Sequence, residues 1–211
     1  AGSDGSGASA KTESPCGSTT YSVGPPPGRS PRTWTRLAGS FQAGWRTDPA
    51  RSGKVGSMGD IGTHALNLAE YISGLKVTEL CADLSIFVPG RRLDDDGNVL
   101  VHYNNGAKGI LFASQIAAGE ENDLNIRIYG EKGGLKWHQM EPNTRMLKWP
   151  DRSMEVMRTG AGKLSKAASA HTRDPERHPA AYIEEFANIY RNFADPVSRF
   201  QNGRQPDPVL D

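Results

Sequence analysis

The sequence predicts an α+β domain with an open, mostly antiparallel sheet and helices packed on one face. Strand-like runs follow one another through the middle of the chain with no helical pattern between them. An apolar pattern of helical period precedes these runs, and a second one follows them. Strands that are linked without an intervening helix pair antiparallel, and this order of elements therefore favours α+β over α/β.

The first helix is expected over residues 60–73. Asp60 can cap its first turn, and Gly74 can end it in a left-handed conformation. Apolar side chains recur along it at helical spacing and form the expected core face: Ile61, Ala65, Leu68, Ala69 and Ile72.

Six strand-like runs follow, and Asn104-Asn105-Gly106 between the second and third is a strong hairpin signal. Residues 151–177 are polar and irregular, which predicts a long surface loop. The last helix is expected over residues 179–194, ended by Asp195-Pro196. The expected strands are 77–88, 99–103, 108–116, 124–129, 135–140 and 145–149.

The first 40 residues differ from the rest of the chain. Gly, Pro, Ser and Thr occupy 25 of these 40 positions, and such a segment buries too little apolar surface to offset its ordering entropy. The sequence therefore predicts a disordered N-terminal tail over 1–40 and an ordered domain over 41–211.

Composition excludes several classes of function. Lys+Arg number 25 and Asp+Glu 24, so the net charge of +1 gives no reason to expect a nucleic acid or an anionic membrane as partner. No apolar run approaches the ~20 residues of a membrane helix. Cys16 lies in the polar tail, and Cys81, in an apolar run, is expected to be a buried free thiol. Two cysteines make no disulfide framework, and the cytoplasm is the expected location.

The helix over 60–73 carries the candidate site. At about 100° per residue, Asp60, His64, Asn67 and Tyr71 share one narrow stripe beside the apolar face. A carboxylate and an imidazole four residues apart can hold the ring in one tautomer for general acid–base work. Two alternatives stay open: Asp60 is only an N-cap and His64 a half-buried structural histidine, or both bind a metal, which no nearby His or Cys supports.

Two flanking segments add candidates for substrate binding. Arg46, beside Trp45, precedes a glycine-rich loop that leads into the helix, and its guanidinium could bind hydroxyls or a carboxylate. The alternative for Arg46 is a surface ion pair with Asp48. His178 opens the last helix and either faces a pocket or is solvated.

Three other patterns lack the context that their chemistry needs. The string 5–10 matches a loose dinucleotide pattern but follows no strand, and the string 160–163 lacks the upstream glycine and the Ser or Thr of a phosphate loop. The acidic run Asp94-Asp95-Asp96, after Arg91-Arg92, is expected to be a solvated hairpin tip, without the spacing of an EF-hand.

Several strings together resemble a known family. They are Trp45-Arg46, then Gly59-Asp60-Ile61-Gly62-Thr63-His64-Ala65 with Leu68-Ala69, then Gly130-Glu131-Lys132-Gly133-Gly134-Leu135, and finally His178-Pro179 with Tyr182 and Phe186. Over residues 41–211 the chain resembles the C-terminal domain of the glucose–fructose oxidoreductase and inositol dehydrogenase (Gfo/Idh/MocA) family.

The resemblance implies a hydride transfer between NAD or NADP and a sugar, inositol or related polyol. It implies that His64 is the acid–base residue, that Asp60 orients it or binds an adjacent hydroxyl, and that Arg46, Trp45 and His178 line the substrate pocket. It also implies a homo-oligomer formed through the sheet.

The family's nucleotide-binding Rossmann domain and its Glu-Lys-Pro motif have no counterpart here, and residues 1–40 resemble nothing in that domain. We therefore expect this chain to be the substrate-side half of such an enzyme, a fragment that is inactive by itself. The alternative is a non-catalytic binding or oligomerisation module derived from the same fold.

Overall fold

The computed structural model describes residues 41–205 except 118, 163, 176–177 and 181. The predicted disordered tail, Cys16 and the string 5–10 lie outside the described residues. The chain divides into two compact units. The first comprises the residues through Glu120 together with Ile126–Gly133, and the second comprises Glu121–Asn125 and the residues from Gly134 onward.

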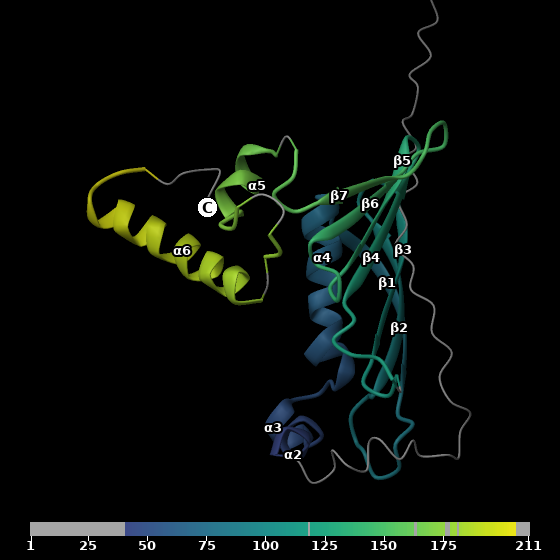
Figure 1. Cartoon of the computed structure of the whole chain (residues 1–211). Coiled ribbons are helices and arrows are strands. Elements are labelled where there is room, and N and C mark those ends of the chain that lie inside the picture. The colour runs from purple at the N-terminus through teal and green to yellow at the C-terminus, as the bar shows by residue number, and fades with distance from the viewer. Residues whose placement is uncertain (1–40, 118, 163, 176–177, 181, 206–211) are drawn as a thin grey trace, which may run out of the picture. The chain divides into compact units, whose positions relative to one another are not determined.

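The order of elements confirms the predicted class: helices, a meander of strands, then helices (Figure 1). The helices are α2 (Phe41–Arg46), α3 (Pro49–Ser52), the π-helix η1 (Met58–Gly62), α4 (Thr63–Ser73), α5 (Lys166–His171) and α6 (Tyr182–Gln201). The strands are β1 (Val77–Ser85), β2 (Asp96–Tyr103), β3 (Lys108–Ser114), β4 (Asn125–Gly130), β5 (Gly133–His138), β6 (Thr144–Lys148) and β7 (Glu155–Arg158).

The first unit is built on an antiparallel sheet of order β1-β2-β3. The Asn104-Asn105-Gly106 turn joins β2 to β3 as predicted, with Gly106 at φ 87°. Alternate residues of β2 point to one face, so Val99, Val101 and Tyr103 are buried there. Met58 of η1 packs against this cluster, and α4 contacts β3. Helix α4 ends at Gly74 in the predicted left-handed conformation.

The outer face of this sheet carries apolar side chains that the described residues leave exposed. We call outer row the three residues that pair across the strands: Cys81, Leu100 and Ile110. Leu100 is 55% exposed and Ile110 36%. The prediction that Cys81 is buried is wrong, because it lies on an edge strand and faces away from the core; it is an exposed free thiol.

The second sheet has the order β4-β5-β6-β7, so the strands form two open sheets rather than one. Strands β5, β6 and β7 pair antiparallel. The prediction that 151–177 is only a loop is wrong, since the segment contains β7 and α5. Strand β7 has four residues, too few to show an alternation, and α5 is a short helix whose N-cap Ser165 accepts from the Ala168 N–H.

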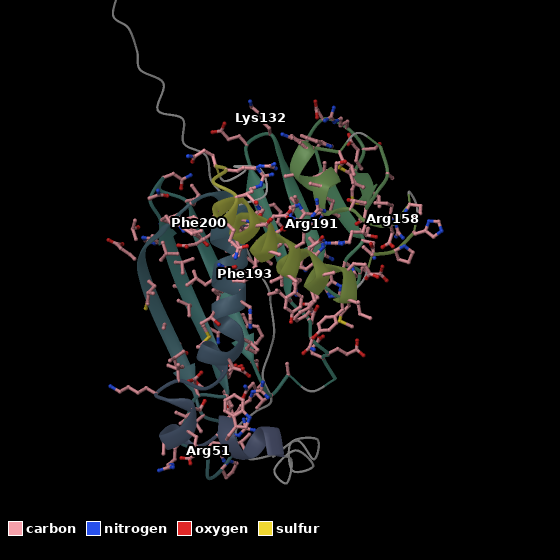
Figure 2. All side chains as sticks on the ribbon, turned by 90° about the vertical axis from the view of Figure 1, so that its left-hand side faces the viewer. Arg51, Lys132, Arg158, Arg191, Phe193 and Phe200 are labelled. Carbon is pink, nitrogen blue, oxygen red and sulfur yellow. The ribbon has the colours of Figure 1, made fainter. Side chains whose placement is uncertain are left out.

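Helix α6 extends past its predicted end at Ala194 and runs through Pro196 to Gln201. Pro196 removes one helical hydrogen bond, and the Arg191–Asp195 ion pair lies in the turn that precedes it. The helix ends before Gly203, at φ 65°. Polar bonds tie α6 to α5, among them Asn192 to His171. The side chains of Phe193 and Phe200 are 72% and 85% exposed on α6 (Figure 2).

Within the described residues, no helix has both the length and the apolar character needed to cross a bilayer.

Candidate functional site

The candidate site lies in the first unit, where the chain enters α4 through the π-helical turn η1. The prediction that Asp60 caps this helix is wrong. Asp94, from the loop between β1 and β2, takes that role: the Gly56 N–H donates to its Oδ1 at 2.6 Å and the Met58 N–H to its Oδ2 at 2.8 Å. A carboxylate at a helix N-terminus satisfies free amides and complements the helix dipole. The Asp60 carboxylate therefore does not cap the helix and makes other contacts instead.

The acidic run Asp94-Asp95-Asp96 is buried, and the prediction of a solvated hairpin tip is wrong. These residues are 8%, 0% and 7% exposed, respectively. Asp95 accepts from the Phe87 and Val88 N–H groups at 2.8 and 2.9 Å. Buried carboxylates are tolerated here because backbone donors and Arg91 compensate the lost hydration.

The pKa of Asp96, the first residue of β2, is shifted by its surroundings. Burial raises its pKa above the ordinary value of 3.8, against hydrogen bonds from Ser114 and Asn98 that lower it. The nearby Asp95 and Asp83 carboxylates raise it further, since like charges disfavour ionisation.

The Asp60 carboxylate is held by two side chains from different parts of the unit. Arg46 Nε lies 3.1 Å from Oδ2, and Gln115 Nε2 donates to the same Oδ2 at 3.1 Å. The Arg46 and Asp60 side chains are each 33% exposed, so the pair lies at the surface of the unit and not in its core. We call Asp60, Arg46 and Gln115 the carboxylate clamp.

Two details of the clamp differ from the sequence-based expectation. The alternative in which Arg46 pairs with Asp48 is wrong, because Asp48 caps α3 at the Ala50 N–H and pairs with Arg92 at 3.0 Å. Gln115 was missed. It follows the last residue of β3, where no local pattern distinguishes it from other polar residues that end a strand.

His64 lies in the first turn of α4 and is exposed. Among the described residues, no hydrogen bond joins it to Asp60. The expected stripe assumed about 100° per residue, but a π-helical turn holds more residues and rotates Asp60 relative to α4. Asn67 and Tyr71, farther along α4, are exposed as well, Tyr71 at 83%.

The remaining two candidates are Trp45, which precedes Arg46 of the clamp, and His178. The guanidinium of Arg46 stacks on the Trp45 ring, with Cζ 4.8 Å from the ring centroid, which orients Arg46 toward Asp60. His178 belongs to the second unit; it is exposed, and its Nδ1 lies 3.3 Å from the Pro175 carbonyl oxygen. Its place in the substrate pocket stays a prediction.

Neither the start of η1 nor the string 160–162 forms a phosphate-binding site. The amides at the start of η1, which could bind a phosphate, are taken by Asp94. The string 160–162 lies after β7 and opens no helix there. Nor do the described residues bring three or more His, Cys, Asp or Glu side chains together as a metal would need.

The geometry therefore offers an oriented carboxylate and an open imidazole. The ion pair with Arg46 and the hydrogen bond from Gln115 both involve Oδ2 of Asp60, and no described residue donates to Oδ1. A fixed carboxylate oxygen can accept a hydrogen bond from a hydroxyl, and an exposed imidazole can exchange a proton at neutral pH.

Comparison with known proteins yields both sequence and structural relatives. The uncharacterized oxidoreductase YfiI of Bacillus subtilis (strain 168) is 34% identical over 168 residues, which are 79% of this chain and 42% of YfiI. An oxidoreductase from Sinorhizobium meliloti has 42% identity and a TM-score of 0.67, over 74% of this chain and 44% of that one.

An inositol dehydrogenase homolog from Azotobacter vinelandii has the same fold. Its complex with NAD+ has a TM-score of 0.74 and 29% identity, over 83% of this chain and 45% of that one. Its complex with NADH and myo-inositol has a TM-score of 0.71 and 28% identity, over 80% of this chain and 44% of that one.

The chain spans less than half the length of each of these relatives. Residues 28–136, more than half of the chain, match the model of the GFO/IDH/MocA C-terminal domain. The chain therefore belongs to the GFO/IDH/MocA family, in which it represents the C-terminal domain.

Proposed function

We propose that this chain is the substrate-side part of an NAD(P)-dependent oxidoreductase that transfers hydride between the nicotinamide and a sugar, inositol or related polyol. The observation that carries the proposal is the carboxylate clamp at the start of the helix that bears His64. A similar chain from Azotobacter vinelandii has been solved with NADH and myo-inositol, which supports this substrate class.

In this proposal His64 accepts the proton of the reacting hydroxyl during oxidation and returns it during reduction, because histidine is the side chain that most often serves as a general acid–base group. Asp60 accepts a hydrogen bond from a neighbouring hydroxyl through Oδ1, while Arg46 and Gln115 hold Oδ2. Arg46 therefore acts mainly through Asp60, and Trp45 supports it by stacking. His178 and Trp45 line the substrate pocket in the complete enzyme.

The nicotinamide supplies or accepts the hydride when bound. Because Asp94 occupies the amides at the start of η1, we expect most contacts to the nucleotide to come from other residues. A nicotinamide fluorescence titration of the chain with NADH and NADPH tests this point. Saturable binding at micromolar nucleotide would contradict it.

The reaction is tested in a chimera that carries residues 41–211 in place of the matching part of YfiI. We expect NAD(P)-dependent turnover of a polyol, measured by NADH absorbance. His64→Ala should reduce this turnover by ~10² or more, the usual contribution of a general acid–base residue. The control is Lys132→Ala, an exposed residue in the turn between β4 and β5, which should leave turnover unchanged. Equal turnover in both variants would remove His64 from this role.

We also propose that the chain forms a homo-oligomer through the outer face of the first sheet. The outer row supports this, because Leu100 and Ile110 are exposed beside one another on an open sheet. If the chimera and the chain bind no polyol while the oligomer forms, the alternative of a non-catalytic oligomerisation module is favoured. Sedimentation velocity and ligand-observed NMR with myo-inositol measure the two properties separately.

A further inference from the structure

We propose that Asp94 is a positioning residue that fixes the π-helical turn η1 and thereby sets the place of the Asp60 carboxylate. The role of Asp60 in the reaction rests on the proposed function. The geometric part of the inference rests on the contacts of Asp94 alone.

Asp94 holds the entry to η1 at three consecutive amides. Its carboxylate accepts from the Gly56 and Met58 N–H groups, and its carbonyl oxygen accepts from the Ser57 N–H at 2.8 Å. The approach is so close that a Cβ on Gly56 would lie 2.0 Å from the Asp94 carbonyl oxygen. The loop therefore rests directly on the backbone of Asp94.

Asp94 is itself fixed by the neighbouring residue. The Asp95 N–H donates to Ser85 at 3.0 Å, and the Asp95 carboxylate accepts from the Phe87 and Val88 amides. The Asp95 carbonyl oxygen also accepts from the Gln115 N–H at 2.8 Å. One buried dipeptide thus holds η1 through Asp94 and the backbone of Gln115 through Asp95.

Asp60 is linked to both residues of this dipeptide, to Asp94 through η1 and to Asp95 through Gln115. Its backbone belongs to the turn that Asp94 anchors: the Asp60 N–H donates to the Gly56 carbonyl oxygen at 3.0 Å. Its side chain binds Gln115, whose backbone is held by Asp95. A shift of the turn relative to this dipeptide would lengthen the bond between Gln115 Nε2 and Asp60 Oδ2. The carboxylate of Asp94 therefore sets the position of the Asp60 carboxylate relative to Gln115.

The test compares Asp94→Asn with Asp96→Asn in the whole 211-residue chain. Both variants replace a buried carboxylate with an amide of equal size, but of the two only Asp94 accepts hydrogen bonds from the entry to η1. An Asn keeps one acceptor oxygen and places an NH2 group against the second amide, so one of the two bonds is lost. Nitrogen-15 NMR reports the exchange rates of the Gly56 and Met58 amides and the side-chain resonance of Gln115.

We expect Asp94→Asn to raise amide exchange at Gly56 or Met58 by about tenfold or more, as the loss of a hydrogen bond to a charged group predicts. We expect the chemical shift of the Gln115 side-chain amide to change in Asp94→Asn and to remain unchanged in Asp96→Asn. Faster exchange with an unchanged Gln115 resonance would overturn the inference, because Asp94 would then hold only the loop.

If Asp94→Asn does not fold, Asp94→Ser is the second variant. It keeps one acceptor, and the same two outcomes apply. The resonances are recorded without substrate or nucleotide. Their result is therefore independent of the turnover assay, which alone reports a failure of the proposed function.

Discussion

Replacing Gly56 by alanine is the most sensitive test of how the entry to the site is built. The added Cβ would lie 2.0 Å from the Asp94 carbonyl oxygen, 3.0 Å from Leu93 Cβ and 3.1 Å from the Asp94 carbonyl carbon. Two of these three neighbours are backbone atoms, which cannot rotate away. The loop must therefore move by more than an ångström to reach ordinary contact.

A movement of that size breaks the 2.6 Å bond from the Gly56 N–H to the Asp94 carboxylate. Overpacking costs about 1–3 kcal/mol, and a hydrogen bond to a charged group contributes about 1.5–3 kcal/mol. We expect Gly56→Ala to lower the free energy of unfolding by ~3 kcal/mol or more, a large part of the ~5–15 kcal/mol of a typical domain. Urea unfolding followed by circular dichroism measures this loss.

The matched control is Gly44→Ala in α2, where an added Cβ meets nothing within 4 Å. Alanine in a helix interior is favoured over glycine by roughly 0.5–1 kcal/mol, so this variant should be slightly more stable than the parent. A cost for Gly56→Ala below ~1 kcal/mol would refute the reasoning, because the loop would then move without losing its contacts with Asp94.

Three further predictions follow from buried or exposed groups. Because burial raises the pKa of Asp96, folding favours its protonated form. The contribution of Asp96 to the free energy of unfolding is therefore fully present below pH 3.8 and is lost as the pH rises through the raised pKa. Asp96→Asn should therefore gain stability over the parent from acidic to neutral pH in urea titrations, and a constant difference would contradict this. Leu100→Lys should reduce the sedimentation coefficient of the oligomer while Glu131→Lys, in an exposed turn, leaves it unchanged; an unaltered oligomer would exclude the outer face. Asn143→Ala removes both bonds to the Ala180 backbone, at 2.8 and 2.9 Å, and should raise amide exchange at the start of α6; unchanged exchange would show that α6 is held elsewhere.

Features set by neighbouring residues could be predicted from the sequence. The hairpin at Asn104-Asn105-Gly106 and the helix end at Gly74 depend on backbone conformations that a few residues determine. The strand expected over 99–103 likewise lies within β2, which extends from Asp96 to Tyr103. The family resemblance was equally local, since it rested on the strings around Asp60 and His64.

Features that depend on distant residues could not be predicted. Asp94 lies 36 residues from Met58, and nothing in a run of three aspartates shows that their partners are backbone amides elsewhere. Gln115 is 55 residues from Asp60, and its side chain is placed by the register of β3. The same limit explains the error about Cys81, because burial of an edge strand depends on what covers it.

The long-range cap on η1 has a consequence for the order of folding. An isolated helix of this length is marginal in water, and its first turn receives its acceptors only after the loop between β1 and β2 has formed. Closing that contact requires the intervening chain to lose entropy first, which slows folding in proteins rich in distant contacts. We therefore expect pairing of β1 with β2 to precede completion of the turn that carries Asp60, and the first turn of α4 to be among the last parts of the unit to acquire native structure.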